Sequence, residues 1–265
     1  MRTPLIAGNW KMHKTVGEAR DFVENLRVEV AEVENAEVIV CPTYTALYEV
    51  SRTAMGSKVG VGAQDMFWKD KGAWTSRISP GMLLDCGCTY VIIGHSETRG
   101  RFGAADPEMT PELLKLFGET DESVNKKIHA ALAAGLKPIM CCGETIDERK
   151  AGKTDEVIKT QVEKGFAGLT AEQAAGMVIA YEPVWAIGTG EVCDTPEANR
   201  VCGMIRSTVK GLFGDAAAES VRVQYGGSVK PDNAKELLSQ SDIDGALVGG
   251  AALKVADFVA IVKSA

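Results

Sequence analysis

The stretch MVIAYEPVWAIGTG, from Met177 to Gly190, decides the fold. Its first five residues form a continuous apolar run, and the carboxylate of Glu182 follows at once, ahead of Pro183. Runs of this kind are typical of strands covered on both faces, as in parallel sheets. A carboxylate at the end of such a strand is costly to desolvate unless it is paired or used. We therefore expect a buried parallel strand that ends on a functional Glu182.

Seven further apolar runs resemble this strand, which is expected at Met177–Tyr181. They are Leu5–Ala7, Glu37–Cys41, Lys58–Gly62, Tyr90–Ile93, Lys137–Cys141, Val221–Tyr225 and Gly245–Val248. Amphipathic helical patterns lie between them, for example at Gly17–Val33, Asp121–Ala134, Thr154–Gly168 and Pro196–Phe213. Eight alternating units of about 33 residues predict an α/β fold, a (β/α)8 barrel, with one domain spanning residues 1–265. A doubly wound open sheet is the alternative, but its usual Gly-x-Gly-x-x-Gly turn does not follow the first strand.

One segment interrupts the alternation of strands and helices. Residues Ala104–Gly118 separate the fourth strand from its helix and have no counterpart elsewhere in the pattern. Thr110 and Pro111 make a good helix start and Gly118 a stop, so Pro111–Phe117 is expected to form a short additional helix. We interpret residues 104–118 as an insertion after strand 4.

The composition excludes several classes of function. The net charge is −7 and no Lys or Arg run occurs, so we expect no nucleic-acid partner. The seven cysteines lack a Cys-x-x-Cys pair and only three histidines are present, which favours reduced thiols, a cytoplasmic location and no metal site. No uncharged apolar run approaches the roughly 18 residues that span a bilayer, so we expect no membrane partner.

Polar residues and glycine pairs follow several expected strands, at the rim where the active sites of such barrels lie. Singly, they have ordinary explanations: a solvated lysine, a structural histidine or a turn glycine. Two successive glycine pairs, after the last two strands, favour a phosphate site made of backbone N–H groups. Together they predict one active site, formed by Asn9, Lys11, His95, Ser96, Glu97, Glu182, Gly226, Gly227, Ser228, Gly249 and Gly250.

The segments that carry these residues closely resemble signatures of the triosephosphate isomerase family. They read AGNWKM (Ala7–Met12), GAQD (Gly62–Asp65), IIGHSE (Ile92–Glu97), CCGET (Cys141–Thr145), AYEPVWAIGTG (Ala180–Gly190), YGGSV (Tyr225–Val229) and GALVGGA (Gly245–Ala251). The resemblance covers nearly the whole chain except Ala104–Gly118. It implies a single-domain TIM barrel and an isomerase of glycolysis and gluconeogenesis that needs no cofactor. The implied reaction interconverts D-glyceraldehyde 3-phosphate and dihydroxyacetone phosphate through an enediolate.

The resemblance also implies a role for each polar residue. Glu182 resembles the base that moves the carbon-bound proton, and His95 resembles the neutral imidazole that polarises the carbonyl. Lys11 and Asn9 resemble the groups that stabilise the developing oxyanion, with Glu97 paired to Lys11.

A further set of residues resembles the phosphate site and lid of the family. Gly188, Ser228, Gly249 and Gly250 match the positions that wrap the phosphate. Pro183–Cys193 resembles a lid that excludes water and suppresses phosphate elimination. Tyr225 and Ser228 would latch that lid, whose hinge and tip contain Pro183, Val184, Trp185, Ala186, Ile187, Gly188, Thr189 and Gly190. Its second hinge reads Glu191-Val192-Cys193, which departs from the family pattern.

The family resemblance implies a homodimer as well. Gln64 and Thr75 resemble residues of an interdigitating loop that steadies the neighbouring subunit's site. Arg77 and Thr98 replace a Glu and an Arg that pair across the interface in relatives. We hypothesise that an acidic residue of the insertion (Asp106, Glu108 or Glu112) partners Arg77 of the other chain.

Two other functions fit the same pattern. A paralogue acting on a tetrulose phosphate would share the chemistry, although the AIGTG lid tip argues against a longer substrate. A non-catalytic barrel that binds sugar phosphates is expected to lack Glu182, His95 or Lys11, and all three are present.

Overall fold

Eight parallel strands form a closed barrel in the computed structural model, which describes residues 2–104 and 106–265. The strands are β1 (Leu5–Asn9), β2 (Glu37–Cys41), β3 (Val59–Ala63), β4 (Tyr90–Ile93), β5 (Lys137–Cys142), β6 (Val178–Tyr181), β7 (Arg222–Tyr225) and β8 (Gly245–Val248). Each strand pairs with its neighbours in the sequence, and β1 also pairs with β8. The predicted (β/α)8 barrel is therefore confirmed. The largest shift is in β1, which continues past Ala7 and ends on Asn9.

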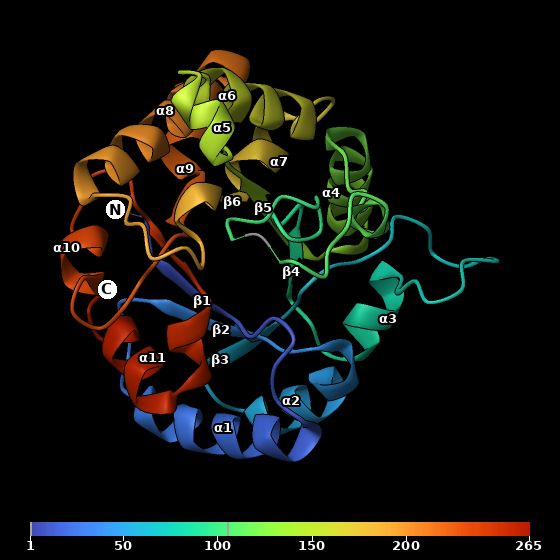
Figure 1. The fold of residues 1–265 in the computed structure, drawn as a ribbon. Coiled ribbons are helices and arrows are strands. Elements are labelled where there is room, and N and C mark those ends of the chain that lie inside the picture. The colour runs from blue at the N-terminus through green and yellow to red at the C-terminus, as the bar shows by residue number, and fades with distance from the viewer. Residues whose placement is uncertain (1, 105) are drawn as a thin grey trace.

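Helices surround the barrel, as Figure 1 shows. They are α1 (Val16–Glu29), α2 (Leu47–Ala54), α3 (Pro80–Asp85), α4 (Asp121–Ala134), α5 (Ile146–Lys150), α6 (Thr154–Gly165), α7 (Ala171–Ala175), α8 (Thr195–Phe213), α9 (Asp215–Ser220), α10 (Ala234–Leu238) and α11 (Val255–Val262). Within the described ranges, no helix combines the length and apolar character that crossing a bilayer requires.

Two predicted helices end earlier than the sequence pattern indicated. Helix α1 stops at Glu29 instead of Val33, because the chain turns after Val30 and Val33 packs back against the core. Helix α6 stops at Gly165 instead of Gly168, where φ is +79° and the chain turns towards α7. In both cases tertiary packing overrides the helical periodicity.

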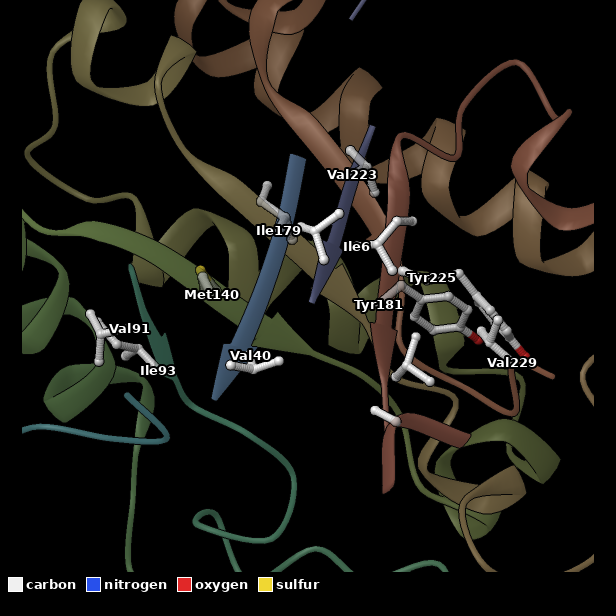
Figure 2. Packing of buried hydrophobic residues seen from close by; sticks show 14 of the residues in the cluster. Ile6, Val40, Val91, Ile93, Met140, Ile179, Tyr181, Val223, Tyr225 and Val229 are labelled. Atoms are coloured by element: carbon white, nitrogen blue, oxygen red, sulfur yellow. The ribbon is translucent and has the colours of Figure 1, made fainter. Parts of the chain in front are cut away.

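The strands bury both faces, so the chain forms two cores. Alternate residues such as Leu5, Ala7 and Ile92 point into the barrel and form the inner cluster. The residues between them belong to the larger cluster between barrel and helices, where Figure 2 shows Ile6 and Ile93 among others. Because successive side chains of a strand alternate in direction, burial on both faces explains why the strands read as continuous apolar runs.

The insertion between β4 and α4 forms less helix than predicted. A 3₁₀ helix spans Leu113–Leu116, in place of the helix expected over Pro111–Phe117, and none of its residues is buried. A seven-residue segment without a buried face gains too little to offset the cost of helix nucleation. Residue 105, within the predicted insertion, lies outside the described residues.

A polar cluster fills the amino-terminal end of the barrel, opposite the predicted site. The hydroxyl of Tyr90 lies 2.8 Å from both carboxylate oxygens of Glu37 and accepts a bond from Arg222 Nη2 at 2.9 Å. Arg222 Nη1 also donates to Glu37 at 2.8 Å. The three residues join β2, β4 and β7 across the barrel interior.

Replacing Tyr90 with Phe should lower the free energy of unfolding by about 1–2 kcal/mol, because the hydroxyl that Glu37 and Arg222 share is lost. Urea unfolding followed by circular dichroism measures this. Tyr48→Phe is the matched control: Tyr48 is 58% exposed, and its hydroxyl receives only a long bond from Arg52. Equal stability losses in the two variants would contradict a role for the cluster.

Candidate active site

A cavity of about 770 Å³ opens at the carboxyl ends of the strands. Apart from Glu97, the structure brings the residues predicted for the chemistry and for phosphate binding to this one cavity, from five strand ends, those of β1, β4, β6, β7 and β8. Its walls include Asn9, Lys11, His95, Glu182, Gly188, Ser228, Gly249 and Gly250. The carboxylate, the imidazole and the ammonium group therefore face a common space.

Glu182 follows β6 and is only 2% exposed. One carboxylate oxygen accepts the backbone N–H of Ser96 at 2.9 Å. The other lies 2.9 Å from Nε2 of His95 and 3.3 Å from the Ser96 hydroxyl. These contacts hold a buried carboxylate at a fixed place at the mouth of the barrel.

The pair His95 and Glu182 influences the ionisation of both groups. Burial raises the pKa of Glu182, but the His95 side chain and the Ser96 N–H outweigh it, so the pKa lies below its ordinary value. Burial lowers the pKa of His95, and the neighbouring Glu182 carboxylate outweighs this, so that pKa is raised. Glu182 is therefore ionised at neutral pH despite its burial.

The other ring nitrogen of His95 carries no proton in this geometry. Nδ1 accepts the backbone N–H of Glu97 at 3.2 Å. A proton on Nδ1 would break this bond, so the geometry places the single proton on Nε2, facing Glu182. The N–H of Glu97 thus favours the neutral imidazole, against the pull of the Glu182 carboxylate towards the charged form.

Lys11 adopts an unusual backbone conformation with φ of +50°. Its ammonium group lies 2.6 Å from Oε1 of Glu97, the partner expected from the resemblance. Its N–H donates to the side chain of Asn9 at 3.1 Å, and its carbonyl accepts a bond from Gln64 at 2.8 Å. Left-handed backbone is unfavourable for a lysine and persists only where surrounding contacts fix it.

Gln64 also contacts the site within its own chain. The resemblance assigned Gln64 to a loop that steadies the neighbouring subunit, and here its amide donates to the carbonyls of Lys11 and Cys41 of its own chain. The reason is its position directly after β3, at the same rim as the ends of β1 and β2.

The segment after β6 stands open over the cavity. Residues Val184–Ala186 form a 3₁₀ turn, whereas Gly188, Thr189 and Gly190 are exposed. The indole N–H of Trp185 donates to Glu144 at 2.9 Å, which fixes the base of this segment. Within residues 2–104 and 106–265, no hydrogen bond joins the side chain of Tyr225 or Ser228 to the exposed tip, so the expected latch is not engaged.

Comparison with known proteins agrees with this geometry. The family model described as triosephosphate isomerase matches residues 4–265. Triosephosphate isomerases of Carboxydothermus hydrogenoformans and Moorella thermoacetica are 52% and 53% identical, each over 99% of both chains. The crystal structure of the Bartonella henselae triosephosphate isomerase superposes with a TM-score of 0.84 at 36% identity, covering 99% of this chain and 98% of that one.

The chain belongs to the triosephosphate isomerase family. It is therefore an enzyme, an aldose–ketose isomerase built on a TIM barrel.

Two residues that position the triosephosphate isomerase site had no role assigned to them from sequence. Ser96 was placed in the predicted site without a role, and its N–H and hydroxyl both bind Glu182. Glu144 is fully buried and binds both Trp185 and Tyr181, and burial raises its pKa. The only sequence signal for Glu144 was its place in the CCGET segment, which says nothing of its partner 41 residues later.

The pH dependence of ionisation at the site tests the lowered pKa of Glu182. A carboxylate whose pKa is lowered stays ionised until the pH falls below its ordinary value of 4.5. The carboxylate band of Glu182, identified in infrared spectra by its loss in Glu182→Gln, should therefore persist down to about pH 5. The activity profile does not report Glu182 alone, because the raised pKa of His95 also changes the charge of the imidazole on the acid side. A carboxylate band that disappears well above pH 5, with circular dichroism unchanged, would contradict the assignment.

Proposed function

We propose that this enzyme interconverts D-glyceraldehyde 3-phosphate and dihydroxyacetone phosphate with Glu182 as the base. The observation that carries the proposal is a buried, ionised carboxylate that shares one cavity with His95 and Lys11. Glu182 takes a proton from one substrate carbon, forms an enediolate, and returns the proton to the adjacent carbon. The substrate gains and loses no electrons overall, so this route requires no nicotinamide and no metal.

His95 and Lys11 stabilise the charge that develops on the substrate oxygens. A neutral imidazole with its proton on Nε2 can donate to the carbonyl oxygen and then move protons between the two oxygens. The Nδ1 contact with the Glu97 N–H supports this tautomer. Lys11 and Asn9 also line the cavity and supply further preorganised donors, and Glu97 holds the ammonium group of Lys11.

The phosphate would lie against backbone N–H groups at the far side of the cavity. Gly249 and Gly250 follow β8 and lead into a 3₁₀ turn, Gly250–Leu253, with Ser228 beside them on the wall. Gly188 comes from the lid, so closure over the substrate would complete the phosphate site. A closed lid, latched at Tyr225 and Ser228, would exclude water and limit elimination of phosphate from the enediolate.

We further propose that the enzyme acts as a homodimer. The segment between β3 and α3 projects away from the barrel in Figure 1 and carries Thr75. Exposed apolar side chains support an interface here, since Trp74 in this segment is 49% exposed and Met82, on the helix α3 that follows it, is 54% exposed. Large apolar side chains gathered at a surface mark interaction sites in soluble proteins.

Arg77 in this segment would meet an acidic residue of the partner's insertion. Within its own chain the guanidinium lies 5.7 Å above the ring of Phe67, and no salt bridge of the described residues includes it. Thr98, which replaces the family's Arg, instead donates to Glu119 of its own chain at 2.6 Å. A dimer structure that places Asp106, Glu108 and Glu112 all beyond about 8 Å from the partner's Arg77 guanidinium, one Debye length, would remove this pairing.

The cellular setting follows from the same assignment. We propose a cytoplasmic enzyme that serves glycolysis and gluconeogenesis. All seven cysteines are unpaired and six of them are buried, which suits a reducing compartment.

Replacing Glu182 with Gln should reduce kcat/KM by several orders of magnitude while the fold is retained, because an amide cannot accept the proton. A coupled assay on glyceraldehyde 3-phosphate measures this, with the exposed Glu156→Gln as the control that keeps wild-type activity. The same assay with a tetrulose phosphate tests the competing substrate. A Glu182→Gln variant that retains most of the rate would overturn the assignment of the base.

A further inference from the structure

We propose that Gly103, just before the insertion, is a positioning residue whose backbone contact stabilises the open position of the lid, Pro183–Cys193. The inference rests on the proposed function in one respect, that the segment after β6 closes over the substrate. It concerns a contact between two parts of the chain that are about 80 residues apart.

The contact is a close approach of two backbones. A Cβ atom placed on Gly103 would lie 2.3 Å from the carbonyl oxygen of Val184 and 2.3 Å from that of Ile187. These oxygens mark the two ends of the first hinge turn, where the Ile187 N–H also donates to the Val184 carbonyl. Real Cβ atoms do not approach an oxygen so closely, so only glycine fits here without displacing one segment.

Contacts of the neighbouring residues fix the position of Gly103. The two ends of the insertion meet beside it, since the rings of Phe102 and Phe117 pack edge to face at 5.4 Å. Gly100 has φ of +71°, and a Cβ there would lie 2.9 Å from the carbonyl of Phe117. Arg101 donates to the carbonyl of Gly143 at 3.1 Å, which ties this base to the loop after β5.

The lid side of the contact leads directly to the active site. Ala186, Ile187 and Gly188 line the cavity, and the turn that Gly103 touches immediately precedes Gly188. The tip is exposed and, among the described residues, receives no hydrogen bond from the side chain of Tyr225 or Ser228, so the contact is one that the open, unlatched lid makes. In Figure 1 the green segment after β4 runs across the mouth of the barrel towards β6, in agreement with this contact.

In this proposal, closure of the lid moves the carbonyls of Val184 and Ile187 away from Gly103. A side chain at position 103 therefore destabilises the open lid more than the closed one and shifts the population towards closure. A lid that favours closure binds substrate more tightly and releases product more slowly. The effect is thus a joint decrease of KM and kcat, which simple damage to the site does not produce.

The test is Gly103→Ala, measured by steady-state kinetics and by the affinity for a phosphorylated hydroxamate that mimics the enediolate. We expect KM and kcat each to fall about three- to tenfold, and the hydroxamate to bind more tightly by a similar factor. Gly118→Ala is the matched control at the other end of the insertion, because its Cβ would meet only the Lys115 carbonyl at 3.7 Å. It should leave all three quantities unchanged.

Phe117→Ala provides a second variant should Gly103→Ala fold poorly. It loosens the base that supports Gly103 and should shift the same quantities in the same direction by a smaller factor. Unchanged values in Gly103→Ala, or a raised KM with weaker hydroxamate binding in either variant, would contradict the proposed role of Gly103. Those outcomes leave the proposed function intact if the wild-type enzyme is active and depends on Glu182, whereas an inactive wild-type enzyme would overturn the proposed function itself.

Discussion

The pairing of β8 with β1 closes the sheet, and closure forces every carboxyl end to face one rim. Residues that are distant in the chain then become neighbours: His95 follows β4 and Glu182 follows β6, 87 positions later, yet their side chains lie 2.9 Å apart. The same closure leaves the strands apolar on both faces, since one face fills the barrel and the other packs on the helices. The architecture thus separates an apolar barrel body from a polar rim. Polar side chains at the rim find their hydrogen-bond partners mainly among one another.

Burial of the Glu182 carboxylate is the strongest local consequence of this arrangement. Desolvation opposes its charge, and Ser96 and His95 supply the compensation. The compensation has a functional side, because a base held by two protein groups must exchange some of those contacts for the substrate. Lid closure offers a physical cause for that exchange, since the lid begins one residue after Glu182 and its hinge is anchored by Trp185 to Glu144. In the proposal above, Gly103 adds a backbone contact between this hinge and the start of the insertion, and only the open lid makes this contact.

Much of the fold could be predicted from the sequence, because buried parallel strands leave continuous apolar runs that differ from helical periodicity. Glu182, His95 and Lys11 could be found because each follows such a run, and the family resemblance covered the same segments. Other features depend on partners that sequence spacing does not reveal. The bonds of Ser96 and Glu144, and the contact of Gly103 with Val184, join distant parts of the chain. The early ends of α1 and α6 likewise reflect packing of Val30 and Phe166 into the core, which local periodicity cannot report.

A structure with the phosphorylated hydroxamate bound would test the central claim most directly, that one cavity unites base, imidazole and ammonium around a single phosphorylated compound. The account predicts that the hydroxamate oxygens lie against His95 and Lys11, with the phosphate at Gly188, Ser228, Gly249 and Gly250. It also predicts that the Glu182 carboxylate has left Ser96 and lies over the carbon atoms that exchange the proton. A bound compound that leaves Glu182 on Ser96, with its phosphate away from the glycine turns, would contradict the account.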